Sequence, residues 1–72
     1  MKIEYDPVHD LLNLEFLPDV EIEKSVEVDG IILDYAKDRR IVAIEVLGAS
    51  KRTTQDPLHL IDVSIVRQAM GK

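Results

Sequence analysis

The residues best suited to chemistry gather in one short turn near the N-terminus. Asp6, His9 and Asp10 lie within five positions, and carboxylates with an imidazole can bind a divalent metal or transfer protons. Asp side chains in such a segment also accept hydrogen bonds from the backbone that follows them, which builds a turn without any ligand. We favour turn formation, because short motifs of this kind are weakly specific. A metal site made of these three residues is the alternative.

Two further acids, Asp34 and Glu45, lie on adjacent predicted strands and could be cross-strand neighbours. A pair of carboxyl groups brought together can share a proton or hold a cation. Each of the two acids is flanked by apolar residues, however, which is the pattern of a strand with one solvent-exposed face. We therefore expect both side chains to project from the solvent face of the sheet.

The remaining polar residues do not form a recognisable catalytic or ligand-binding motif. His59 and Asp62 are three positions apart and would share a helix face, but two ligands are too few for a metal site. Lys51 and Arg52 are two adjacent basic residues in a linker. The serines lack a nucleophile elbow or a base partner, and three scattered glycines cannot form a phosphate loop. We therefore predict neither an enzyme nor a bound cofactor.

The charge distribution also limits the choice of partner. The chain has 72 residues and a net charge of −5, with −7 in residues 1–49 and +2 in the remainder. An acidic body lacks the clustered cations that nucleic-acid phosphates require, whereas it suits a basic protein partner. No apolar run is long enough to span a membrane, and no export signal or cysteine is found, so the predicted location is the cytoplasm.

The small size of the chain favours self-association. Only three residues are aromatic, so the 46% of hydrophobic residues are mainly aliphatic. A domain of this length buries barely enough apolar surface to offset the conformational entropy of folding. A second copy of the chain is an accessible source of further burial, and we predict a homodimer or a complex with a small protein.

Alternation of apolar and polar residues predicts an antiparallel β-meander of five strands, at about 3–5, 12–16, 21–28, 31–35 and 40–47. Asp29–Gly30 is typical of a tight hairpin turn. The high charge of the third strand indicates an edge strand. Val42, Ile44 and Val46 share a face that we expect to be the centre of the core.

The pattern changes after residue 48. We expect a polar linker over 49–56 and a helix over 57–70, which gives one α+β domain over 1–72 with the meander in 1–48. Asp56–Pro57 can cap and start the helix. A sixth strand remains the alternative, since Ile61, Val63 and Ile65 also alternate. The helical spacing joins Leu58, Ile61, Ile65, Val66 and Ala69.

Several segments resemble a family of small prokaryotic domains, catalogued as domain of unknown function 2283. They are the opening residues 1–7 (MKIEYDP), then 10–16 (DLLNLEF), 30–35 (GIILDY) and 40–50 (RIVAIEVLGAS). Two positions where the family usually has glycine carry Arg39 and Ala43, so Arg39 is expected in a mildly strained turn. The resemblance implies a compact, strand-rich domain without an established activity. It also implies an antitoxin or partner-binding role, because members are often encoded beside small toxin-like proteins.

Taken together, these features favour a non-enzymatic protein-interaction module over a metal-binding or ligand-binding protein. Leu11, Ile32 and Ala43 lie opposite the predicted core face, which leaves an apolar strip uncovered, and such strips usually mark interaction surfaces. The residues expected at the interaction surface are Ile32, Ile44, Leu58, Ile61, Ile65 and Val66.

Overall fold

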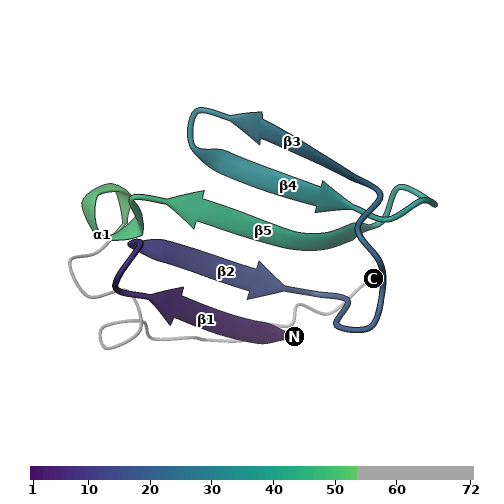
Figure 1. Cartoon of the computed structure of the whole chain (residues 1–72), viewed down its shortest axis with the longest axis horizontal. Helices are drawn as coiled ribbons and strands as arrows, with labels where there is room; N and C mark the ends of the chain where they lie inside the picture. Colours follow the sequence, from purple (N-terminus) through teal and green to yellow (C-terminus); the bar gives the residue numbers. More distant parts are fainter. Residues whose placement is uncertain (54–72) are drawn as a thin grey trace, which may run out of the picture.

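A computed structural model describes residues 1–53 of the chain, and the predicted helix over 57–70 lies outside this range. Five antiparallel strands form one sheet, and a short helix follows them (Figure 1). This confirms the predicted small α+β fold. No helix within residues 1–53 has the length and apolar character needed to cross a bilayer. The elements are β1 (Lys2–Asp6), β2 (Leu11–Glu15), β3 (Lys24–Val28), β4 (Ile31–Tyr35), β5 (Ile41–Leu47) and α1 (Ala49–Arg52).

The strand order is β1-β2-β5-β4-β3, with β5 in the centre of the sheet. β3, β4 and β5 form a meander, and the β1–β2 hairpin pairs with the free side of β5. The segment 16–23 carries the chain from β2 across one end of the sheet to β3 (Figure 1). β3 is therefore an edge strand, as its charge predicted.

The strand register divides the sheet into two faces of different character, because directly paired residues point to the same side. One side, here called the apolar face, contains two uninterrupted rows that each cross all five strands, and the pair Lys24–Tyr35 lies beyond them on β3 and β4. The first row is Ile3, Leu14, Ile44, Leu33 and Val26, and the second is Tyr5, Leu12, Val46, Ile31 and Val28.

The opposite side, here called the acidic face, carries one cation among many acids. Lys2 is its one basic residue among the strand positions, and its acids are Glu4, Asp6, Glu15, Glu27, Asp34 and Glu45. Leu11, Ile32 and Ala43 lie on this side, as predicted from their alternation. Ala43 is buried, while Leu11 and Ile32 are half-buried. The apolar strip therefore interrupts an acidic surface.

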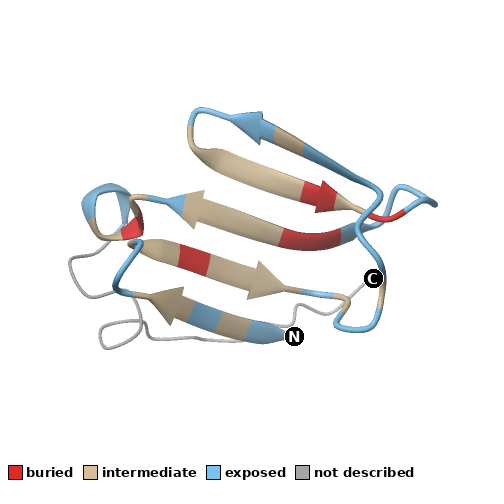
Figure 2. Cartoon of the chain, viewed as in Figure 1, coloured by how far each residue is buried: buried red, intermediate tan, exposed pale blue. Residues whose placement is uncertain are grey.

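Most of the buried residues, namely Asp34, Ala36, Val42 and Ala43, lie toward one end of the sheet, while Leu12 of β2 and Ala49 of α1 are buried elsewhere (Figure 2). Leu17 and Val20, from the 16–23 segment, pack against a cluster of Ala36, Val42 and Ala43. Of the residues predicted to form the core centre, Val42 is buried, but Ile44 and Val46 are only half-buried. Within residues 1–53 the core therefore lies where the 16–23 segment covers the sheet.

Two boundaries differ by more than one residue from those predicted. β3 begins at Lys24 and not at Glu21, because residues 16–23 are used in crossing the end of the sheet. The predicted linker over 49–56 begins instead with the helical turn α1, whose first residue, Ala49, is fully buried. A single helical turn is too short to show a helical period in the sequence.

The hairpin turns have the backbone expected from their residues. Asp29 and Gly30 have φ of +52° and +79°, the left-handed pair that a tight β-hairpin requires. Arg39 has φ of +76°, so this non-glycine residue occupies a left-handed turn position where the resembling family usually has glycine. The cost of such a conformation is about 1 kcal/mol relative to glycine.

Candidate functional site

α1 joins the two hairpin turns that lie at the same end of the sheet. At its start, the Ser50 backbone N–H and hydroxyl donate to the Asp10 carboxylate at 3.0 and 2.7 Å. At its end, the Arg52 guanidinium donates to the backbone oxygen and the carboxylate of Asp29. Ser50 and Arg52 therefore hold α1 against the β1–β2 and β3–β4 turns, and Arg52 is not the free linker cation that the sequence suggested.

Of the three residues predicted as metal ligands, Asp6 and His9 contact each other, whereas Asp10 has other partners. Asp6 accepts hydrogen bonds from the backbone of Val8 and His9, and its other oxygen lies 2.7 Å from His9 Nδ1. Asp10 instead accepts the Tyr5 hydroxyl at 2.6 Å and the two groups of Ser50. Among residues 1–53 no three His, Cys, Asp or Glu side chains are grouped as metal ligands. The side chains of Asp6, His9 and Asp10 already hydrogen-bond within the turn and to α1. Metal binding by this turn stays a prediction.

Hydrogen bonds hold both aspartates of this turn in the ionised form. The contact with His9 is the main reason that the pKa of Asp6 lies below its ordinary value. The Tyr5 hydroxyl, followed by Ser50, likewise lowers the pKa of Asp10. Asp10 also has φ of +50°, a conformation that Asp tolerates better than most residues. Both carboxylates therefore act as acceptors that shape the backbone.

A second cluster lies in the middle of the sheet, on its acidic face. Asp34 of β4 is only 3% exposed, which corrects the expectation that it projects into solvent. The Ser25 hydroxyl on β3 donates to its carboxylate at 2.5 Å. The Glu45 carboxyl on β5 hydrogen-bonds to it from the other side. The two acids are thus cross-strand neighbours, and they form a carboxyl pair.

The two carboxyl groups are too close, and too poorly solvated, for both to carry a charge at little cost. The hydrogen bond to Asp34, followed by partial burial, raises the pKa of Glu45 from its ordinary 4.5 to about 7. Near neutral pH Glu45 therefore keeps a proton for much of the time and donates it to the Asp34 carboxylate.

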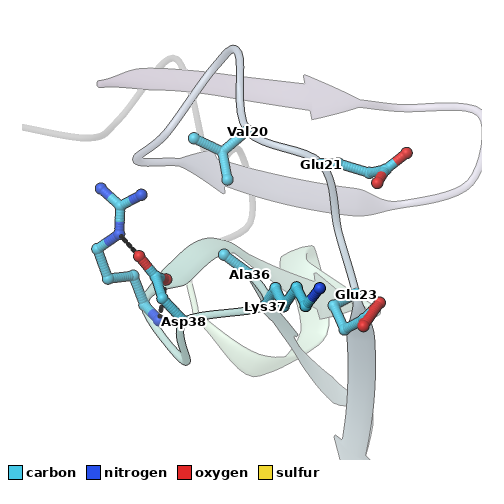
Figure 3. A pocket seen from close by; sticks show the side chains of 7 residues that line it. Val20, Glu21, Glu23, Ala36, Lys37 and Asp38 are labelled. Atoms are coloured by element: carbon cyan, nitrogen blue, oxygen red, sulfur yellow. Dashed lines mark hydrogen bonds and ion pairs between the residues drawn. The ribbon is translucent and has the colours of Figure 1, made fainter.

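Three hollows lie along residues 1–53, and one of them, about 430 Å³, is lined by residues of β3 and β4. Two others lie closer to the groups discussed above. One of about 260 Å³ lies beside Glu45 on the acidic face, and Glu4 and Asn13 also line it. The other, about 370 Å³, lies where the 16–23 segment passes the β4–β5 turn (Figure 3). There the Arg40 backbone N–H and guanidinium both donate to Asp38, so the nearest opposite charges satisfy each other. Neither hollow brings a nucleophile and a base together.

Sequence reasoning found Asp34 and Glu45 but missed Ser25 as their partner. Ser25 is directly opposite Asp34 in the register of β3 and β4, and that alignment follows from the Asp29–Gly30 turn. Counting back from this turn would have identified the pair. The predicted interaction residues Ile32 and Ile44 lie on opposite faces of the sheet, while Leu58, Ile61, Ile65 and Val66 lie outside the described residues.

Comparison with known proteins gives a family without an assigned activity. Residues 2–50 match the family described as "Protein of unknown function (DUF2283)". The whole chain is 33% identical to an uncharacterized protein of Methanocaldococcus jannaschii, and it covers 61% of the length of that protein. No solved structure gave a significant match.

Proposed function

This chain belongs to the DUF2283 family, and we propose that it is a non-enzymatic protein-interaction module that pairs with a second copy through the apolar face. The observation that carries the proposal is the incomplete burial of that face. Eight of the ten side chains in its rows are half-buried and Val28 is 63% exposed, so that only Leu12 is buried. An apolar surface that spans a whole sheet usually marks an interaction site.

The chemistry of the apolar face suits a second copy. Neither of its rows contains a charged residue, so the rows of two such faces can meet without bringing like charges together, while Lys24 lies exposed beyond them on β3. Elsewhere the chain carries a net charge of −5, and two acidic faces would repel each other. Two sheets packed face to face, about 10 Å apart, would bury both sets of rows as in a β-sandwich.

The test of this proposal is the mass of the full chain in solution, measured by sedimentation equilibrium over a range of protein concentrations. We expect twice the chain mass at micromolar concentration, with weak dependence on salt because the contact is apolar. A chain that stays monomeric throughout the range would overturn the proposal. It would leave residues 54–72 of the same chain as the next candidate to cover this face.

A second candidate is supported by the acidic face, which would suit a small basic protein, as an antitoxin-like role requires. Its acids surround the half-buried Leu11 and Ile32, an arrangement that suits a partner with cations around an apolar centre. We expect capture of one basic protein from a host lysate at low salt, and loss of it with Glu4→Lys and Glu27→Lys together. If the amount of protein captured changes neither with salt concentration nor with the two charge reversals, the result would contradict this candidate.

A further inference from the structure

The pair of Asp34 and Glu45 spans the β4–β5 pairing, which is the one strand pairing that joins two parts of the sheet. In the order β1-β2-β5-β4-β3, the boundary between β5 and β4 separates the β1–β2–β5 half from the β3–β4 half. Asp34 lies on β4 and Glu45 on β5, so their hydrogen bond crosses this boundary. Ser25 extends the same chain of contacts to β3.

The register between the two strands is irregular next to this contact. Asp34 is paired with Ala43, but the next residue, Tyr35, is paired with Ile41, which leaves Val42 as an extra residue on β5. An extra residue of this kind disrupts the ladder locally. The side-chain contact between Asp34 and Glu45 therefore adds to the strand pairing next to this irregularity.

No cation faces the carboxyl pair from the neighbouring strand positions. Directly opposite Glu45 are Asn13 on β2 and Ile32 on β4. The next charged residues of the acidic face are acids, namely Glu15 on β2, Glu27 on β3 and Glu4 on β1. The one lysine among the strand positions of the acidic face, Lys2 on the edge strand β1, forms an ion pair with Glu4 at 3.6 Å. The strand positions of residues 1–53 therefore supply no cation to compensate a second negative charge at the pair.

We propose that Asp34 and Glu45 form a pH-dependent bridge between β4 and β5. The bridge forms when the two carboxyl groups share one proton, and it weakens when that proton is lost. With the proton present, Glu45 donates to Asp34 and the boundary is bridged. Without it, two carboxylates face each other in a poorly solvated place and repel. The inference stands apart from pairing through the apolar face, because both carboxyl groups lie on the opposite side.

The direction of the pH dependence follows from the raised pKa of Glu45. Unfolded chains release this proton near pH 4.5, whereas the folded chain keeps it to about pH 7. Between these values the folded state binds more protons, so its stability falls as the pH rises. The full difference corresponds to about a 300-fold change in the folding equilibrium constant. Since Glu45 is only half-buried, we expect a change of about 10- to 100-fold.

The experiment compares urea unfolding of the full chain at about pH 5 and pH 8 in the wild type, Glu45→Gln and Glu27→Gln, at one protein concentration. Glutamine can donate a hydrogen bond to Asp34 at either pH, so Glu45→Gln should lose the 10- to 100-fold dependence and be the most stable of the three at pH 8. Glu27→Gln removes an exposed acid from the same face and should behave as the wild type.

Carboxyl carbon chemical shifts provide the second measurement, because they report the proton without any need for unfolding. We expect the Glu45 carboxyl in the wild type to titrate near pH 7, and the Asp34 carbon to respond at the same midpoint. Titration of Glu45 near pH 4.5 would overturn the proposal. So would an equal pH dependence of stability in the wild type and Glu45→Gln.

Discussion

Replacement of Ile44 with lysine should convert the paired chain into a monomer. Ile44 lies on the central strand and in the middle of the first row of the apolar face. In a symmetric pair each substitution appears twice, so two unpaired ammonium groups would be brought into one apolar contact. Burying a charge that has no partner costs roughly 3 kcal/mol or more. We therefore expect the dissociation constant of the pair to rise at least about 100-fold.

Two further variants separate loss of pairing from loss of folding. Leu47→Lys is the matched control, because Leu47 lies on the same strand but on the acidic side and is 38% exposed. Val28→Lys places a lysine on the apolar face at a side chain that is already 63% exposed, so the fold should tolerate it. Sedimentation equilibrium and circular dichroism would be measured on all three. A folded Ile44→Lys chain that still pairs, or equal dissociation by Leu47→Lys, would contradict the assignment of the interface.

The arrangement of the two faces could be predicted from the sequence because a strand has a period of two. Alternation along residues 2–47 was sufficient to put Leu11, Ile32 and Ala43 on one side and Ile44 and Val46 on the other. It was not sufficient to say how deeply each side is buried. Burial depends on what covers the sheet, and the 16–23 segment covers Val42 while leaving Ile44 half-buried.

The environment of Asp34 could not be predicted from its neighbours in the sequence. A lone acid between two apolar residues usually marks the wet side of a strand, and its side chain does lie on the acidic face. What buries it is the order of the strands, which places Ser25 on one side and β5 on the other. The contacts of Asp10 with Ser50 are similarly invisible, since they join residues 40 positions apart.

Removal of the Asp34 carboxyl group should be the most destabilising single change on the acidic face. Asp34→Ala deprives the Ser25 hydroxyl and the Glu45 carboxyl of their acceptor, and it leaves space at a position that is 3% exposed. A hydrogen bond to a charged group contributes about 1.5–3 kcal/mol, and less where the partner is exposed, as Ser25 is. We therefore expect a loss of about 2–4 kcal/mol in the free energy of unfolding at pH 5, where the shared proton is in place.

At pH 8 the same substitution should cost less, because it also removes the repulsion between Asp34 and an ionised Glu45. Asp34→Asn is the matched variant, since its amide can accept from Ser25 and donate to Glu45 in either protonation state. We expect Asp34→Asn to be near neutral at pH 5 and stabilising at pH 8, when measured by urea unfolding. Asp38→Ala, in the exposed β4–β5 turn, controls for removing any carboxylate. A change of less than about 0.5 kcal/mol in Asp34→Ala, the range of ordinary surface substitutions, would show that the pair does not hold β4 to β5.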